Sequence, residues 1–302
     1  MRQPETFVAG RFAVPHGQGG AFAMRVRILL TVIGLLLLTS GASAQPQRIV
    51  SLDYCADQYV LGLADRSQIA ALSPDARADF SSHADIAEGL PQARPLAEEI
   101  IAHRPDMVVR SWGGDPRILA LFERLDIPVH QIGHIADFDD IRRETRGAAS
   151  AFGQPERGDA VLATMDGALA SVSAASATSA LYVTPGGVTA GQGTFVDALL
   201  SAAGLRNAAA SQTGWVSLPL EAVATQTPAI FVTGFANSAT DRVDRWSASR
   251  HPVMRRALSA RPVLALDTGV IACTTWLAGA EAARLHAFAL RQQPLSGTGA
   301  QP

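Results

Sequence analysis

EEIIAHRPDMVV (residues 98–109) predicts a short helix that exposes Glu98, stops before Pro105 and leads into a buried strand. Proline ends such a helix because it lacks a backbone N–H and its ring clashes with the preceding turn. EAVATQTPAIFV (residues 221–232) has the same order, with Glu221 again seven residues before its proline. Two copies of one unit, 123 residues apart, predict two similar lobes rather than one continuous domain.

Other short apolar runs also occur twice, in the same order. Strands are expected at 48–52, 68–72, 107–110 and 127–132 in the first lobe, and at 180–183, 230–233 and 261–266 in the second. Predicted helices separate these runs, which is typical of βα units and a mainly parallel sheet. The expected fold class is α/β, with one such sheet in each lobe. The glycine-rich segment 186–194 and the segment 267–276 are expected to be loops.

The segment 138–178 is alanine-rich and predicted to be helical, with a break near Gly153. Its second half, residues 156–173, would span about 27 Å at 1.5 Å per residue, enough to connect the lobes. The expected organisation is an N-terminal lobe (45–137), this helical linker, a C-terminal lobe (179–290) and a disordered tail (291–302).

Residues 1–44 have the pattern of a leader. The basic stretch 24–27 precedes an apolar run at 28–38, and small residues follow as far as Ala44. This indicates a cleavable secretory signal peptide at 24–44, because the apolar run is too short for a stable membrane span. Residues 1–23 resemble neither a leader nor a domain, so we expect translation to start at Met24. No cysteine follows the cleavage site, and a soluble periplasmic protein without a lipid anchor is expected.

The charge balance of the remaining chain bears on its partners. Removing residues 1–44 takes away four arginines and one glutamate, so the 25 basic and 27 acidic side chains become 21 and 26. The remaining 258 residues carry a net charge of −5. An acidic balance of this kind argues against a nucleic-acid partner, which would favour a basic patch.

Cys55 and Cys273 are the two cysteines of the chain. In an oxidising compartment they are able to form a disulfide. The sequence places them near opposite ends, one in each expected lobe, and does not show whether their Cα atoms approach within about 7 Å. We therefore favour two free thiols or thiols that face a ligand, with the disulfide as the alternative.

Familiar catalytic signatures are missing from the sequence. It contains no GxSxG, HExxH, CxxC or P-loop pattern, and GQG at 191–193 lacks the third glycine of a dinucleotide fingerprint. His130 and His134 are four residues apart, but the first falls in an expected strand and the second in the loop beyond it. They are interpreted as surface or core histidines rather than metal ligands. We expect no enzyme activity, no resident cofactor and no metal site.

Aromatic and small residues occupy the loops that follow the strands. In open α/β sheets ligands bind beyond the carboxyl ends of the strands, so these loops should line a cleft. Tryptophans from two lobes indicate a flat or bulky ligand held by stacking. The candidate ligand-binding residues are Tyr54, Asp75, Phe80 and Trp112 in the first lobe, and Trp215, Phe235 and Trp276 in the second.

In this order the motifs resemble the class III substrate-binding proteins, which serve ABC importers for vitamin B12, ferric siderophores and haem. The resemblance runs from about residue 48 to residue 290. The motifs are RIVSL (48–52), E-x6-PDMVV (98–109), WGG (112–114), the long helix, GW-x4-LE (214–221) and PAIFV (228–232).

This resemblance implies two α/β lobes joined by one long helix, a ligand cleft between them and a small closing motion. It also implies that one glutamate on each lobe docks into arginines of the membrane permease, and Glu98 and Glu221 occupy the matching positions. Two carboxylates at a fixed spacing would give register and salt-sensitive steering. The implied partners are a small-molecule metal chelate and an ABC permease with its cytoplasmic ATPase; the protein itself is expected to be a monomer.

Three ligand classes remain open at this point. Trp112 and Trp215 match aromatic positions of the vitamin B12 binders, which favours a corrinoid, although Asp53-Tyr54-Cys55 departs from the loop expected there. A ferric siderophore would favour arginine, for which the candidates are Arg110, Arg117 and Arg245.

Haem binding, the third class, would use Tyr54 or His134 as a ligand to the iron. Two further functions are less favoured. An exported metal chelatase or hydrolase would need a nucleophile or metal cluster, and a free zinc or manganese binder would need several histidines and carboxylates from both lobes.

Overall fold

The computed structural model describes residues 45–173, 178–225, 228–235 and 247–292. The expected signal peptide at 24–44, the residues before it and residues 293–302 of the expected tail lie outside these ranges. Within them, no helix combines the length and the apolar character that a bilayer span requires.

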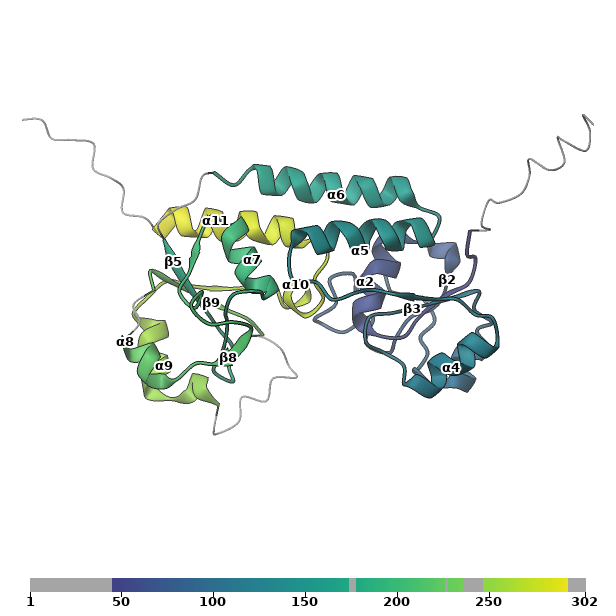
Figure 1. Ribbon diagram of the computed structural model, residues 1–302, viewed down its shortest axis with the longest axis horizontal. Coiled ribbons are helices and arrows are strands. Elements are labelled where there is room, and N and C mark those ends of the chain that lie inside the picture. Colours follow the sequence, from purple (N-terminus) through teal and green to yellow (C-terminus); the bar gives the residue numbers. More distant parts are fainter. Residues whose placement is uncertain (1–44, 174–177, 226–227, 236–246, 293–302) are drawn as a thin grey trace, which may run out of the picture. The chain divides into compact units, whose positions relative to one another are not determined.

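The N-terminal lobe contains a sheet of four parallel strands in the order β2-β1-β3-β4 (Figure 1). Val108 and Val109 of β3 are fully buried but belong to different apolar clusters, so the sheet is covered on both faces. The elements are β1 (Ile49–Ser51), α2 (Tyr54–Leu63), the 3-10 helix η1 (Arg66–Gln68), β2 (Ile69–Ala71), α3 (Ala97–Ala102), β3 (Met107–Arg110), α4 (Pro116–Arg124) and β4 (Val129–Gln131).

The C-terminal lobe repeats this topology. Its four parallel strands follow the order β7-β5-β9-β10, so each takes the place of its counterpart in the first lobe. The expected α/β class with two parallel sheets is confirmed. The elements are β5 (Ser179–Val183), β6 (Val188–Ala190), α7 (Phe195–Ala202), β7 (Arg206–Asn207), β8 (Trp215–Ser217), α8 (Leu220–Thr225), β9 (Ile230–Thr233), η2 (Ala248–Arg250), α9 (Pro252–Ser259), β10 (Val263–Ala265), α10 (Thr268–Ala272) and α11 (Ala278–Gln292).

Two segments that were expected to be loops contain regular structure. Strand β6 lies inside 186–194 and pairs antiparallel with β8, so that Trp215 stands on a strand opposite Ala190. The segment 267–276 contains α10, which Asp267 caps by accepting a hydrogen bond from the Val270 N–H at 3.2 Å. These elements are three and five residues long, too short for a periodic pattern to identify them.

Helices α5 (Phe138–Ala151) and α6 (Pro155–Ala170) occupy the predicted helical linker. The break between them is built from Gly153, whose φ is +72°, and from Pro155 at the first position of α6. Helix α5 packs on α2 of the first lobe, whereas α6 packs on both α5 and α11 (Figure 1). Helix α6 therefore connects the two lobes.

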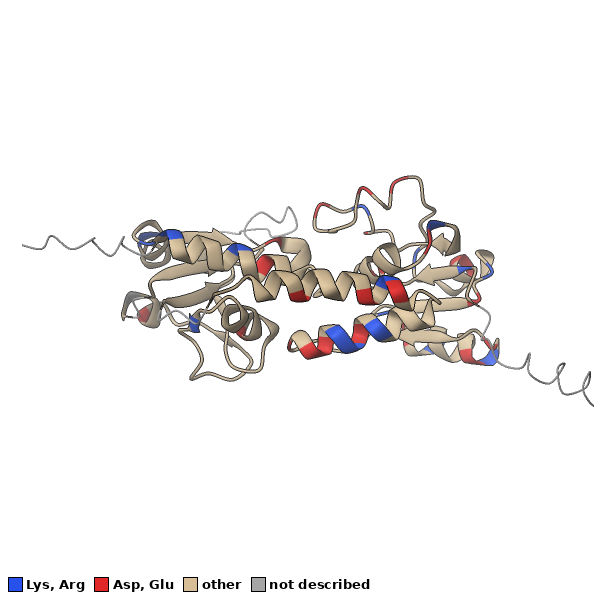
Figure 2. Ribbon diagram, turned by 90° about the horizontal axis from the view of Figure 1, so that it is seen from above, with Lys and Arg blue, Asp and Glu red and all other residues tan. Residues whose placement is uncertain are grey.

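Ion pairs hold α6 along α5. Arg142 binds Asp166 at 2.6 Å, and Arg146 lies 3.6 Å from Asp159. In Figure 2, where the ribbon is coloured by residue type, acidic and basic positions occur along these two helices. Because such exposed pairs contribute only about 0–1 kcal/mol each, their role is to set the register of the helices more than to stabilise them.

Asp57 is a fully buried carboxylate on α2 that binds Ser73, two residues after the end of β2. It accepts hydrogen bonds from the Ser73 N–H at 3.0 Å and the Ser73 hydroxyl at 2.6 Å. Burial raises the pKa of Asp57 from 3.8 to about 6, against the opposing effect of the bonds from Ser73. In the folded state this side chain therefore keeps its proton to a higher pH than in the unfolded chain.

We expect the contribution of Asp57 to stability to be present below about pH 4 and lost as the pH rises through 6, by about 2–3 kcal/mol. Asp57→Asn keeps the hydrogen-bonding shape and removes the titration. The free energy of unfolding is measured by urea denaturation from pH 4 to 7. The value for the variant minus that for the wild type should therefore increase as the pH rises. The exposed control Asp139→Asn should show no such change; equal behaviour of both variants would contradict the assignment.

Candidate ligand-binding cleft

Two adjoining hollows lie where loops of both lobes meet. The first, of about 260 Å³, is lined by Tyr54 and Trp112 from the N-terminal lobe and by Cys273 from the C-terminal lobe. The second, of about 310 Å³, is lined by Trp215 and Phe235 from the C-terminal lobe. The residues His134, Ile135 and Thr274 line both hollows, which therefore form one continuous cleft. Together they reach the size range of small-molecule sites.

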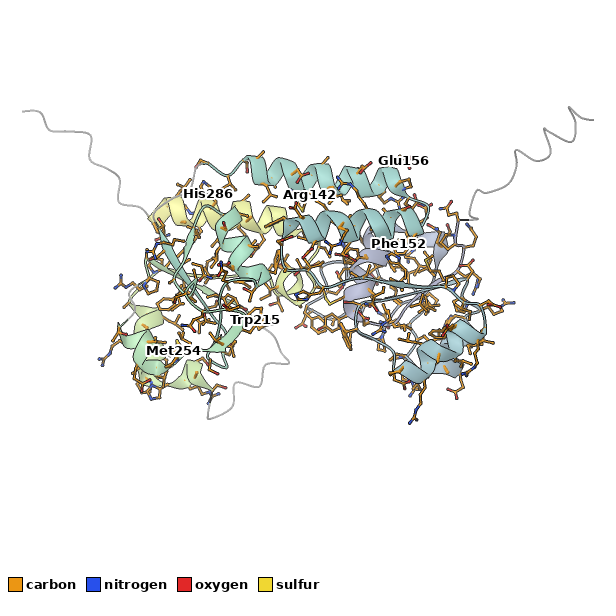
Figure 3. All side chains as sticks on the ribbon, in the orientation of Figure 1. Arg142, Phe152, Glu156, Trp215, Met254 and His286 are labelled. Carbon is orange, nitrogen blue, oxygen red and sulfur yellow. A yellow bond between two sulfur atoms is a disulfide. The ribbon has the colours of Figure 1, made fainter. Side chains whose placement is uncertain are left out.

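Aromatic side chains face this cleft from both lobes. Trp112 is 57% exposed and meets Tyr54 edge-on, with ring centroids 5.3 Å apart. Trp215 is 55% exposed and meets the buried Tyr182 edge-on at 5.9 Å (Figure 3). Each tryptophan is thus supported at its edge by a tyrosine and leaves ring surface open to a ligand.

Asp53 holds Trp112 in place. It is 2% exposed, and one carboxylate oxygen accepts the N–H groups of Ser111, Trp112 and Gly113 at 2.8, 3.0 and 2.8 Å. The other oxygen caps α2 through the Ala56 N–H. A side chain at Gly113 would meet the Leu52 carbonyl oxygen at 2.7 Å, so glycine is required for this close approach.

The described lining of the cleft lacks carboxylate, guanidinium and ammonium groups. No aspartate, glutamate, arginine or lysine belongs to the lining of either hollow in the described part of the chain. Burial, with a further contribution from the carboxylates of Asp53 and Asp75, raises the pKa of Tyr54. Its phenol therefore remains protonated at neutral pH and is available as a hydrogen-bond donor.

The structure separates three of the sequence candidates from the hollows. Asp75 is exposed and lines neither hollow, but its charge contributes to the raised pKa of Tyr54. Phe80 supports Tyr54 at 5.1 Å and lines a different hollow of about 630 Å³ beside α10. Trp276 is 6% exposed and packs edge-on against Tyr59 at 5.7 Å, so it is part of the core rather than the cleft.

Cys55 and Cys273 form a disulfide, with their Cα atoms 4.9 Å apart and 218 residues between them in sequence. The preference for two free or ligand-facing thiols is therefore wrong. The fold brings the first turn of α2 against the residue that follows α10, a proximity that no local pattern reveals. Both cysteines line the first hollow, so the bridge ties the lobes together within the cleft.

His134, Ile135 and Thr274 are cleft residues that the list of sequence candidates omitted. For His134, the available sequence signals were its position just after an expected strand and a residue type that ligates haem iron. The described residues contain no cluster of three or more histidine, cysteine or acidic side chains suited to hold a metal ion. His130, in contrast to His134, is half-buried and packs against Phe152 at 5.9 Å.

The two predicted docking glutamates are exposed, each in the first turn of its helix. Helix α3 ends at Ala102, and the chain turns through Arg104, with φ of +48°, before the proline and β3. The neighbouring Glu99 forms an ion pair with Arg94, whereas within the described residues neither Glu98 nor Glu221 has an ion-pair partner. Both carboxylates are accessible to a second protein.

Residues 49–250 match the model of the periplasmic binding protein family. The chain therefore belongs to this family, and the resemblance to class III substrate-binding proteins is confirmed. Among curated proteins, the chain is similar to an uncharacterized ABC transporter substrate-binding lipoprotein, YvrC, of Bacillus subtilis (strain 168). The two are 23% identical over 242 residues, which cover 74% of this chain and 76% of the relative.

Solved structures share the fold. A periplasmic heme-binding protein, RhuT, of Roseiflexus sp. RS-1 has a TM-score of 0.63 at 21% identity, covering 82% of this chain and 98% of that one. The vitamin B12 binding protein BtuF of Vibrio cholerae has a TM-score of 0.56 at 18% identity, with the same coverages. An Fe3+-hydroxamate transport system structure from Saccharomonospora viridis DSM 43017 has a TM-score of 0.60 at 20% identity, covering 80% and 93%. At these identities the likeness establishes the fold alone.

Removing the disulfide should destabilise the protein substantially. Because the bridge closes a loop of more than 200 residues in the unfolded chain, Cys55→Ala with Cys273→Ala should lower the free energy of unfolding by about 2–5 kcal/mol. Guanidinium denaturation with and without reductant measures this. Reductant should bring the wild type to the value of the double variant and leave the variant unchanged; a wild type that is insensitive to reductant would contradict the prediction.

Proposed function

We propose that this protein is the substrate-binding component of an ABC importer and that it captures a corrinoid, a flat cobalt chelate of the vitamin B12 type, for delivery to the permease. The family supports a small-molecule ligand and an ABC importer as partner. The observation that carries the ligand assignment is the pair of exposed tryptophans, one from each lobe, around a lining whose described residues include no aspartate, glutamate, arginine or lysine. Residues that touch a corrinoid in this proposal are Tyr54, Trp112, His134, Trp215 and Phe235.

Charge separates a corrinoid from the other ligand classes. The amide groups around a corrin ring are neutral and seek hydrogen bonds, stacking and shape. Haem carries two propionates, and many ferric siderophores are anionic, so both favour arginine at the site. Arg110, a siderophore candidate, instead donates to the Trp112 carbonyl oxygen at 3.0 Å and lines a separate groove beside α4. Arg245, another siderophore candidate, lies outside the described residues.

Haem is the second candidate, since a specific observation favours it. His134 and Tyr54 both line the first hollow and are of the residue types that ligate haem iron. The raised pKa of Tyr54 disfavours the phenolate that such ligation would use, which leaves the imidazole as the better ligand. The fold is shared by haem, vitamin B12 and hydroxamate proteins, so a binding measurement must decide among them.

An exported protein fits these observations. The Cys55–Cys273 disulfide suits an oxidising compartment, and the periplasmic binding family suggests an extracytoplasmic location. We propose that the segment 24–44 is a cleavable signal peptide and that the mature chain is free of a lipid anchor. The Bacillus relative, by contrast, is described as a lipoprotein.

The ligand proposal is tested by titrating residues 45–302 with cyanocobalamin, dicyanocobinamide, hemin and a ferric hydroxamate while tryptophan fluorescence is recorded. Corrinoids should quench it saturably with one-to-one stoichiometry. Trp112→Ala and Trp215→Ala should each weaken corrinoid binding about tenfold, the equivalent of about 1.4 kcal/mol of stacking. Trp112→Phe, which keeps an aromatic face, should restore much of the affinity. Tighter binding of hemin than of either corrinoid would overturn the assignment.

The docking proposal is tested separately from ligand binding. Glu98→Arg with Glu221→Arg should abolish uptake by the permease while leaving ligand affinity unchanged, because both side chains lie outside the hollows. The matched control is Glu88→Arg with Glu156→Arg, which makes the same change of charge at exposed glutamates outside α3 and α8. Equal loss of uptake in both pairs would attribute the effect to net charge and refute docking at these two sites.

A further inference from the structure

His134 stands at the junction of the two hollows. Trp112 lines only the first hollow and Trp215 only the second, while His134 lines both. A planar ligand that reaches both tryptophans therefore has this imidazole near its middle. His134 is exposed, and within the described residues its side chain makes no hydrogen bond or ion pair. Both ring nitrogens are accordingly open to a ligand.

The backbone on both sides of His134 is pinned to α5. The Gly133 N–H donates to a Glu144 carboxylate oxygen at 2.7 Å, and the Ala136 N–H donates to Asp140 at 2.8 Å. A side chain at position 133 would meet the Glu144 carboxylate at 2.9 Å, so the loop approaches α5 closely at this glycine. The imidazole is thus presented from a fixed loop, as a preorganised ligand requires.

Two other histidines of the described chain have partners outside the cleft. His286 is buried and contacts the Ser173 hydroxyl at 2.8 Å and the Ala203 carbonyl oxygen at 3.0 Å (Figure 3). His83 packs beside Trp276, with ring centroids 6.3 Å apart. His134 differs from them in combining an open ring, a fixed backbone and a position in the cleft.

We propose that the His134 imidazole coordinates the metal ion at the centre of the bound chelate. A neutral imidazole carries a lone pair on one ring nitrogen and binds transition metals readily. In the proposed step this nitrogen forms a bond to cobalt(III), and the water that occupied the axial position leaves as a water molecule. No electron is transferred, and the corrin ring stays intact.

This inference rests on the proposed function and adds a selection rule to it. Stacking on the tryptophans accepts any flat chelate of suitable size, whereas coordination accepts only one with an exchangeable axial ligand. Aquocobalamin has such a ligand, and in cyanocobalamin a tightly bound cyanide occupies the same position. The protein should therefore favour the aquo form over the cyano form.

The experiment compares these two corrinoids on the full mature chain by absorption spectroscopy and tryptophan quenching. Binding of aquocobalamin to the wild type should shift its near-ultraviolet band as imidazole replaces water, and binding of cyanocobalamin should not. His134→Ala should abolish the shift and weaken aquocobalamin binding about tenfold more than it weakens cyanocobalamin binding. His103→Ala, at a histidine outside the hollows, should retain the shift, which excludes coordination by His103.

The outcomes separate the two proposals. One-to-one quenching by both corrinoids without a band shift, or a shift that survives His134→Ala, overturns coordination by His134 and leaves the corrinoid function standing. Failure of both corrinoids to bind overturns the proposed function, and this inference with it.

Discussion

The cleft depends on the contact between α2 and the segment that follows α10. Trp276 packs on Tyr59 in a space that only Gly62 leaves open, since a side chain there would lie 2.3 Å from the indole ring. The Tyr59 hydroxyl donates to the Thr274 carbonyl oxygen at 3.1 Å, and the disulfide joins the same two elements one turn away. Because α2 begins beside the cleft, this junction also sets the position of Tyr54.

This junction limits how the lobes can move. Helix α6 already connects them, and a covalent bridge at the cleft adds a second connection far from it in sequence. Two connections of this kind favour a small rocking motion over a wide hinge opening, because the residues at the bridge cannot separate. Because Trp112 and Trp215 are each more than half exposed, a ligand can reach both without a wide separation of the lobes.

The repeated architecture could be predicted from the sequence because each copy shows the same pattern over about twelve consecutive residues. A glutamate, a helix-ending proline and an apolar run recur, and the structure places both copies at matching positions of their sheets. Long-range pairings escaped prediction. Only the complete fold brings together the segments that form the β6–β8 pair, the disulfide and the contact of Trp276 with Gly62. Trp276 and Trp112 look alike in sequence, and burial alone separates a core residue from a candidate ligand contact.

The described part of the cleft shows how selectivity can arise where no aspartate, glutamate, arginine or lysine lines the two hollows. Asp53 lies beside the cleft, but four backbone N–H groups already donate hydrogen bonds to its carboxylate. The carboxylate therefore does not need a ligand as a hydrogen-bond partner. A site of this kind gives little advantage to an ionic ligand, because no buried charge awaits compensation. Recognition then rests on stacking, which tolerates many flat chelates, and on directional groups such as an open imidazole, which do not.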